Sequence, residues 1–191
     1  MLSPEDFVVI TGGPGAGKTT LVERLAAAGH ACSPEAGRGV IADQLATGGR
    51  GLPWADRALF AELMLGRDMR SYRQARRRRG PVIFDRGLPD IVGYLRLSGL
   101  PVPTHVDAAA RRFRYRNRVL IAPFWPEIYR QDGARKQTPA EAERTYEHMI
   151  AAYTDYGYEL VHLPRTTVDQ RMRFVLDELA GGHISEKRRR S

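Results

Sequence analysis

The sequence predicts an α/β fold in which a five-stranded parallel sheet carries helices on both faces. Two patterns lead to this prediction. Short, almost continuously apolar segments recur along the 191 residues, and they alternate with longer segments whose apolar residues follow helical spacing. Continuously apolar strands are typical of parallel sheets, because helices cover both faces of such sheets. The chain is long enough for one domain with a sizeable hydrophobic core.

Five short apolar segments are the predicted strands. The first, at 7–11, is rich in β-branched residues and runs directly into a group of glycines. The other four are expected at 30–33, 82–84, 119–122 and 158–163. Ligands of parallel α/β sheets bind at the carboxyl ends of the strands, so the residues that follow these segments are the first candidates for a functional site.

The predicted helices occupy the intervals between the strands. A capping box from Thr138 to Glu141, with proline at the first helical position, starts one helix. The dipeptide Gly80-Pro81 ends the longest one. The helices are expected at 18–28, 40–46, 54–79, 89–97, 104–116, 138–156 and 167–179, the last of them ending ahead of Gly181 and Gly182.

The net charge of the chain favours some kinds of partner, and its cysteine content excludes some kinds of site. The chain has 30 Lys and Arg against 22 Asp and Glu, a net charge of +8, which favours anionic partners such as nucleotides, phosphorylated metabolites, nucleic acid or acidic lipid. The single cysteine, Cys32, excludes an internal disulfide and a cysteine-based zinc cluster. No apolar run is long enough to span a membrane, and the first residues lack the features of a secretory signal, so we expect a cytoplasmic protein.

A glycine-rich motif follows the first strand. Residues 12–19 match G-x-x-x-x-G-K-[ST], in which glycines permit positive φ angles and a close approach of the backbone to phosphate. The motif predicts a P-loop NTPase three-layer sandwich, with Lys18 on the β- and γ-phosphates of ATP and Thr19 on Mg²⁺. A chance glycine turn is disfavoured because a strand and a helix flank the motif as required. The expected nucleotide-binding residues are Gly12, Gly13, Pro14, Gly15, Ala16, Gly17, Lys18, Thr19 and Thr20.

An acid and an arginine follow the third strand. Asp85 is expected to hold Mg²⁺ directly or through water, and Arg86 to clamp a phosphate group with its planar guanidinium. The alternative is a local ion pair at the strand end. Small-molecule kinases of this fold tend to carry such an acid–arginine pair, whereas the Asn-Lys-x-Asp motif that reads guanine is absent, since the one asparagine, Asn117, precedes arginine.

Several segments together resemble a known family. They are the phosphate-loop run at 10–30, Pro-Glu-Ala-Gly-Arg at 34–38, Phe-Asp-Arg-Gly at 84–87 followed by Asp90 and Tyr94, and the stretches 129–135 and 156–164. In these the chain resembles the AAA-labelled family of small predicted ATPases over about residues 7–180. That family is related to ribosylnicotinamide kinase domains and more distantly to deoxynucleoside and thymidylate kinases. The resemblance implies a nucleotide-kinase type of fold with ATP as donor, although some relatives act as nucleotide-binding or lipid-sensing modules.

Further candidates surround the predicted phosphate site. Glu35 follows the second strand, where deoxynucleoside kinases carry a general base, so the resemblance implies that role; the alternative is an ion pair with Arg38. A lid at about 123–140 is expected to supply Arg130 or Arg135 to the transferring phosphoryl group, unless these are solvated loop arginines. The expected acceptor-binding residues are Arg38, Arg57, Asp90 and Tyr94, with Trp54 and Phe60 as further pocket candidates.

Two functions are compatible with these features. The first is a kinase that transfers the γ-phosphoryl group of Mg-ATP to a small metabolite such as a nucleoside or nucleotide. The second is an ATP- or GTP-dependent switch module with a protein, acidic lipid or nucleic acid partner and slow hydrolysis. Arginine clusters such as 76–79 favour solvated helix ends over a nucleic-acid face, because no aromatic residues are interleaved with them. We expect one domain over 1–182 and a basic, disordered tail at 183–191.

Overall fold

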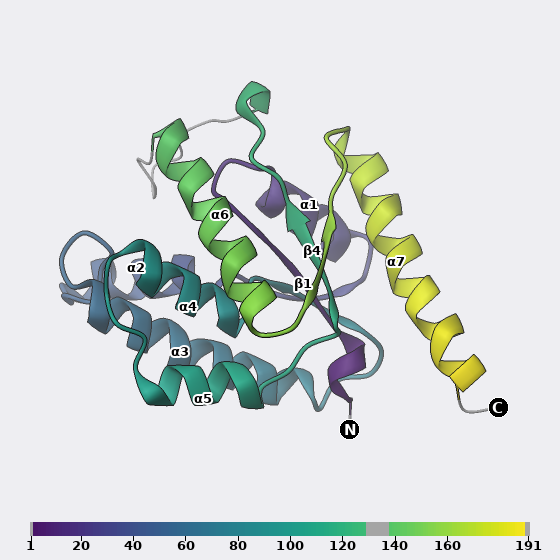
Figure 1. The fold of residues 1–191 in the computed structure, drawn as a ribbon, viewed down its shortest axis with the longest axis horizontal. Coiled ribbons are helices and arrows are strands. Elements are labelled where there is room, and N and C mark those ends of the chain that lie inside the picture. The colour runs from purple at the N-terminus through teal and green to yellow at the C-terminus, as the bar shows by residue number, and fades with distance from the viewer. Residues whose placement is uncertain (1, 129–137, 190–191) are drawn as a thin grey trace.

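The computed structural model describes residues 2–128 and 138–189, and these contain a five-stranded sheet in which every strand pairing is parallel (Figure 1). The strands lie in the order β2-β3-β1-β4-β5, so the phosphate-loop strand is central. Their bounds are β1 (Phe7–Gly12), β2 (Ala31–Ser33), β3 (Val82–Asp85), β4 (Arg118–Ala122) and β5 (Glu159–His162). The predicted fold class is confirmed.

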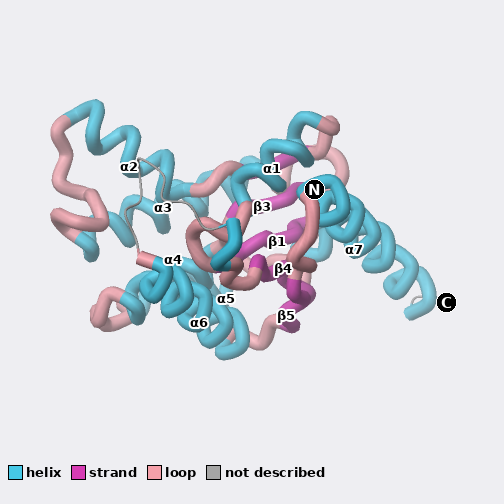
Figure 2. The backbone as a smooth tube through the Cα atoms, turned by 90° about the horizontal axis from the view of Figure 1, so that it is seen from above, coloured by secondary structure: helices cyan, strands magenta, loops and turns pink. Residues whose placement is uncertain are grey.

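Helices cover both faces of the sheet. Figure 2 shows α3, α4, α5 and α6 on one side and α1 and α7 on the other, which makes three layers. Helix α2 packs on α3. The helices described are α1 (Lys18–Ala27), α2 (Ala36–Thr47), α3 (Arg57–Ala75), α4 (Leu88–Leu97), α5 (Thr104–Arg112), α6 (Pro139–Asp155) and α7 (Val168–Arg189), with 3₁₀ turns at Pro4–Asp6 and Pro126–Ile128.

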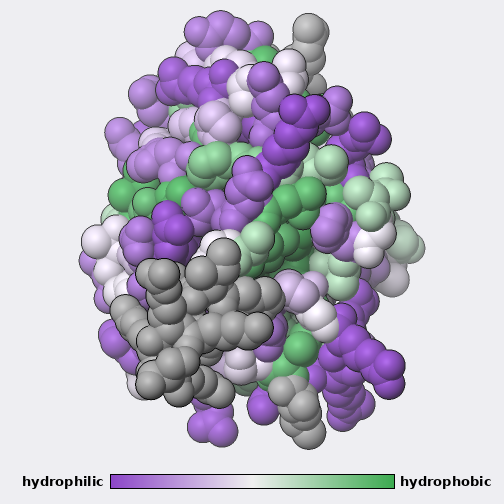
Figure 3. Space-filling model, turned by 90° about the vertical axis from the view of Figure 1, so that its right-hand side faces the viewer, coloured by the Kyte–Doolittle hydropathy of each residue, from purple (hydrophilic) through white to green (hydrophobic). Residues whose placement is uncertain are grey.

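Strand β1 shows why the central strands are mostly apolar. Phe7 and Val9 belong to the core beneath α3–α6, whereas Val8 and Ile10 belong to the core beneath α1 and α7. Alternate side chains of one strand point to opposite faces, so a strand that is covered on both faces needs apolar residues throughout. The face of the molecule toward α7 is hydrophilic over most of its rim, with hydrophobic residues gathered near its centre (Figure 3).

The start of α2 differs from the prediction. The helix begins at Ala36 rather than at 40, so Glu35 occupies its N-cap position. Glycine is a poor helix former, so Gly37 and Gly39 make a helix start at Ala36 difficult to predict from the sequence. A Cβ atom on Gly37 would lie 3.3 Å from Sδ of Met64 on α3. Close packing of α2 on α3 therefore overrides the low intrinsic propensity.

Three further helices differ from their predicted bounds, and one of them, α5, ends at Arg112 rather than at 116. Helix α3 starts at Arg57, where the Asp56 carboxylate accepts a hydrogen bond from the backbone N–H of Leu59 at 3.0 Å, and it ends at Ala75 rather than 79. Helix α7 continues past the expected end near 179 to Arg189, because Gly181 does not take the left-handed conformation of a helix C-cap. No helix in the described part of the chain is long and apolar enough to cross a membrane.

Candidate nucleotide and acceptor site

The turn between β1 and α1 has the backbone of a phosphate loop. Gly12, Gly15 and Gly17 have φ angles of 126°, 70° and 72°, which residues with a side chain rarely adopt. A Cβ on Gly12 would lie 2.3 Å from the carbonyl oxygen of Ala122 on β4, so a side chain there would require β1 and β4 to move apart. Helix α1 begins at Lys18 and directs its positive end at the loop, an arrangement that binds anions.

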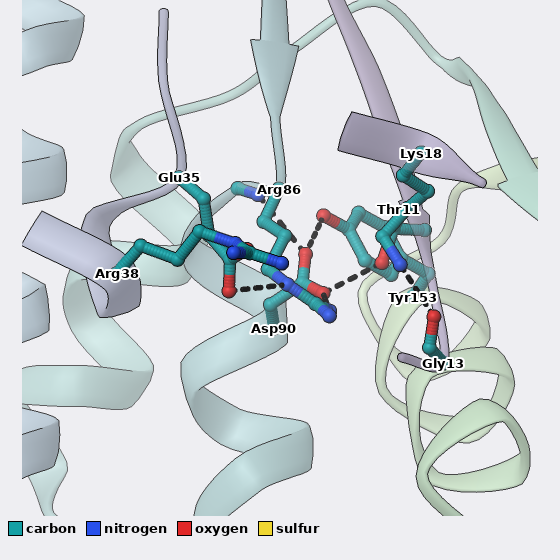
Figure 4. A network of polar contacts seen from close by, with 9 residues as sticks. Thr11, Gly13, Lys18, Glu35, Arg38, Arg86, Asp90 and Tyr153 are labelled. Atoms are coloured by element: carbon teal, nitrogen blue, oxygen red, sulfur yellow. Dashed lines mark hydrogen bonds and ion pairs between the residues drawn. The ribbon is translucent and has the colours of Figure 1, made fainter. Parts of the chain in front are cut away.

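Lys18 lies across the loop that it follows. Its side chain is buried and its ammonium donates a hydrogen bond to the backbone carbonyl of Gly13 (Figure 4). Thr19 is half-buried on the first turn of α1, and Thr20 is exposed. Lys18 and Thr19 therefore share the first turn of the helix whose N-terminus faces the loop.

Asp85 is the last residue of β3 and pairs in register with Ile10 of β1. Its carboxylate is buried, and its Oδ1 finds no hydrogen-bond partner within the described residues. Burial raises the pKa of Asp85, and the nearby charges of Lys18 and Arg86 oppose that rise. A buried carboxylate oxygen without a donor suits a hard divalent cation, and the Thr19 hydroxyl is a ligand of the same chemical class.

Arg86 links three elements at the carboxyl end of the sheet. Its φ of 72° is unusual for a residue with a side chain, and its backbone N–H donates to the carbonyl of Ile10 at 3.0 Å. Its guanidinium donates to Glu35 at 3.1 Å through Nε and to Asp90 at 2.9 Å through Nη1 (Figure 4). The local ion pair that the sequence left open therefore exists, and it is part of a larger network.

Asp90 is the hub of that network. Besides Arg86, its carboxylate accepts hydrogen bonds from the hydroxyls of Thr11 and Tyr153, both at 2.6 Å, and from the N–H of Gly87 at 3.0 Å. The residue is only 6% exposed. A ligand that bound the Asp90 carboxylate would compete with these donors, so the contacts favour a positioning role for a residue that the sequence suggested as an acceptor contact.

Glu35 lies between β2 and α2 and is paired with two arginines. Its Oε1 accepts from Arg86, and its Oε2 accepts from Nε of Arg38 at 3.3 Å. The pair with Arg38, the alternative to a catalytic role, is thus present. Figure 4 shows the side chains of Arg38 and Arg86 reaching Glu35 from different elements.

A cavity of about 980 Å³ adjoins this network. Pro14 of the phosphate loop lines it together with Glu35 and Arg86, so the cavity borders the phosphate site. Phe60 and Tyr94 also line it and form an edge-to-face pair with centroids 5.4 Å apart. Of the acceptor candidates, Arg57, Asp90 and Tyr94 lie on its wall, as does Trp54, whereas Arg38 does not.

A second, smaller cavity of about 490 Å³ also borders the phosphate loop. Gly17 and Thr20 line it together with the residues that follow β5 and with Trp125. The side chain of Arg171 on α7 also lines it, and Nη1 of Arg171 donates to the carbonyl of Ala16 at 2.8 Å. Both cavities therefore border the phosphate loop, the large one at Pro14 and the small one at Gly17.

Comparison with known families supports this geometry. A family model described as an AAA domain matches residues 7–171. The chain belongs to this AAA-domain family. No curated protein matches it in sequence.

Solved structures show that the AAA domain has the fold of P-loop kinases. Deoxyadenosine kinase from M. mycoides with bound dATP is 14% identical, with a TM-score of 0.63 over 91% of this chain and 98% of the other. Thymidylate kinase from Candida albicans is also 14% identical, with a TM-score of 0.63 over 96% and 95%. NadR in complex with NR is 18% identical, with a TM-score of 0.56 over 91% of this chain and 50% of NadR. The family and fold type that the sequence resembles are thereby confirmed.

Two buried charged residues of the AAA domain were missed by the sequence analysis. Asp68 lines the large cavity, and Arg171 contacts the phosphate loop. Both were detectable, because each interrupts the apolar stripe of a helix: Asp68 follows Met64 by four residues, and Arg171 precedes Val175 by four. A charge on an apolar stripe is a signal of a buried polar group.

The predicted lid residues Arg130 and Arg135 lie outside the described residues. The described part of the predicted lid consists of the segment after β4, which contains the 3₁₀ turn Pro126–Ile128, and the start of α6 at Pro139. The capping box predicted at Thr138 is present, since Glu141 accepts from the Thr138 N–H at 2.7 Å. The role of the two arginines stays a prediction.

Proposed function

We propose that this AAA domain is a kinase that transfers the γ-phosphoryl group of Mg-ATP to a hydroxyl group of a small metabolite of about nucleoside size. The observation that carries the proposal is the cavity of about 980 Å³ that borders the phosphate loop and contains Glu35 and Arg86. Its volume lies at the upper end of the usual range for small-molecule pockets. A nucleotide switch that only hydrolyses ATP has no need for a pocket of this size beside the phosphate loop.

The phosphate loop and its neighbours supply the donor site in this proposal. The loop amides and Lys18 bind the β- and γ-phosphates, and the residues around the smaller cavity enclose the base. Thr19 and Asp85 hold magnesium, which neutralises the charge of the phosphate oxygens when it is bound. The orphan Oδ1 of Asp85 supports this assignment, because a cation would satisfy it.

Glu35 and Arg86 carry the acceptor side of the reaction. A hydroxyl acceptor loses a proton during transfer, and Glu35, one of the two carboxylates of the network that line the cavity, takes it. The guanidinium of Arg86 is held by Glu35 and Asp90 on the wall of the same cavity, where it can meet the phosphoryl group. Asp90 positions Arg86 rather than touching the substrate.

The test is acceptor-stimulated release of ADP from Mg-ATP with a panel of nucleosides and nucleotides. We expect at least one panel member to raise ADP release and to appear as its phosphorylated product. Lys18→Ala should abolish the stimulation, whereas Arg24→Ala, which removes an exposed cation from the same helix, should preserve it. Tight ATP binding without stimulation by any acceptor would overturn the proposal and favour the switch module.

A further inference from the structure

Asp68 differs from the other acids on the wall of the large cavity. Four acidic residues of the described chain line that cavity, and three of them accept hydrogen bonds from the protein: Glu35 from arginines, Asp90 from four donors, and Glu141 from Thr138. The carboxylate of Asp68 accepts none from the residues that the structure describes, although the residue is only 8% exposed. Asp68 is therefore a buried hydrogen-bond acceptor on the wall of the cavity, and no protein donor among the described residues reaches it.

The surroundings of Asp68 make its charge unfavourable for folding. Burial raises its pKa well above the ordinary value, the negative charge of Asp90 adds to the rise, and Arg86 and Arg67 oppose it only partly. An unpaired buried carboxylate destabilises a fold, whereas an amide of the same shape would not carry a charge. Folding thus gives no reason for an acid at this position.

The walls near Asp68 are apolar and aromatic. Phe60 and Met64 precede it on α3 by eight and four residues and line the same cavity, and Tyr94 packs against Phe60 on that wall. A ligand with a flat or apolar ring that packs on these side chains would place one edge of the ring next to the Asp68 carboxylate. Such a ligand would need hydrogen-bond donors on that edge, because an ionised carboxylate only accepts.

We propose that Asp68 is the specificity-determining residue of the acceptor pocket and selects acceptors that present an amino group or a protonated ring nitrogen to it. This inference rests on the proposed function, in which the cavity binds the phosphoryl acceptor. An amino group that donates to Asp68 favours its ionised form. The pocket would then discriminate against acceptors with a carbonyl or an anionic group at that edge, since the ionised carboxylate offers them no donor.

Three pairs of nucleosides that differ in one exocyclic amino group provide the test: cytidine and uridine, deoxyadenosine and deoxyinosine, and guanosine and inosine. Each is assayed for phosphoryl transfer, as kcat/KM, and for binding by calorimetry. We expect wild-type protein to prefer the amino member of at least one pair by on the order of 10–100-fold, the value of a hydrogen bond to a charged group. Asp68→Asn should abolish that preference, and Glu62→Gln, an exposed acid on the same helix, should retain it.

The results separate this inference from the proposed function. An amino preference in binding that depends on Asp68, without transfer to any nucleoside, would support Asp68 as the recognition residue of the cavity and refute phosphoryl transfer to nucleosides. Two results would overturn the inference but not the proposed kinase function. One is phosphoryl transfer with equal kcat/KM for the two nucleosides of every pair, and the other is an amino preference that persists in the Asp68→Asn variant. Failure of all six nucleosides to bind would overturn the inference. Thermal unfolding provides the last readout, because a less stable Asp68→Asn protein would make Asp68 a structural residue and refute a role in specificity.

Discussion

Nη1 of Arg171 donates a hydrogen bond to the carbonyl oxygen of Ala16 at 2.8 Å and thereby joins α7 to the phosphate loop. The two residues are 155 positions apart in the chain. Nε and Nη2 of the same guanidinium are buried and find no partner in the described part of the molecule. Burial lowers the pKa of Arg171, which means that burying its positive charge disfavours folding. The conformation of the loop thus depends on the last helix of the domain.

Replacing Arg171 by methionine should separate loop geometry from stability. Arg171→Met removes a charge with two unsatisfied donors, so the free energy of unfolding should stay the same or rise. It also removes the donor to Ala16, and we expect ATP affinity to fall about tenfold, the value of one hydrogen bond from a charged group. Calorimetry and urea unfolding measure the two effects. Arg173→Met, on an exposed position of α7, is the control, and equal ATP affinity in both variants would contradict the prediction.

Asp85→Asn should uncouple nucleotide binding from magnesium. Without magnesium, the variant should bind ATP at least as well as wild-type protein, because a negative charge near the phosphates is gone. With magnesium, wild-type affinity should rise and that of the variant should not, and phosphoryl transfer should fall by more than about 10²-fold. ATP titrations in EDTA and in magnesium buffer measure this linkage. An unchanged magnesium dependence would place the metal ligand elsewhere.

Glu35→Gln distinguishes a hydroxyl acceptor from a phosphate acceptor. If Glu35 takes the proton of a hydroxyl, single-turnover transfer should slow by roughly 10²–10⁴-fold while ATP affinity stays the same. A phosphate acceptor is already ionised and needs no base, so transfer to a nucleotide should slow far less. Glu35→Gln also weakens the ion pair between Glu35 and Arg86. Arg38→Gln serves as the control, because it removes the other ion pair of Glu35 and leaves the carboxylate in place. A loss below about tenfold for a hydroxyl acceptor would remove Glu35 as the base.

Asp68→Asn should stabilise the fold in a pH-dependent way. The folded protein binds the proton of Asp68 more tightly than the unfolded chain, because burial raises the pKa well above the ordinary value of 3.8. Stability is therefore lost as the pH rises from about 4, and the loss is complete only above the folded pKa. The variant should exceed wild-type stability at neutral pH, and the difference should vanish below pH ~4. Urea unfolding across this range checks it, and a difference that does not change with pH would contradict it.

Two glycine-to-alanine changes should have opposite effects. Gly12→Ala places a Cβ 2.3 Å from the Ala122 carbonyl at a φ of 126°, so we expect a loss of about 1–3 kcal/mol in the free energy of unfolding together with weaker ATP binding. Gly66→Ala in α3 meets no atom within 4 Å and should raise the free energy of unfolding by about 0.5–1 kcal/mol without an effect on ATP. Denaturant unfolding and calorimetry measure both, and a stable, ATP-binding Gly12→Ala protein would refute the role of the close approach to β4.

Local patterns in the chain were sufficient for the strand and helix order and for the phosphate loop. The continuous apolar runs predicted buried parallel strands because each strand, like β1, contributes to both cores. The loop motif was readable because its glycines, Lys18 and Thr19 act through a single turn between neighbouring elements. Helix ends were predicted less well, since the start of α2 depends on how closely Gly37 approaches α3.

Pairings across the fold were beyond the reach of local patterns. Thr11 and Asp90 are 79 residues apart, yet a hydrogen bond of 2.6 Å joins them, and this contact supports the proposal that Asp90 positions Arg86. The sequence offered Glu35 a catalytic role or an ion pair with Arg38, and it did not reveal that Arg86 binds the same carboxylate. Whether an acid is paired or left without a donor is set by segments that meet only in the folded chain. The helical pattern around Asp68 could have indicated a buried acid, but only the folded structure shows that this acid lines the large cavity without a hydrogen-bond donor from the described residues.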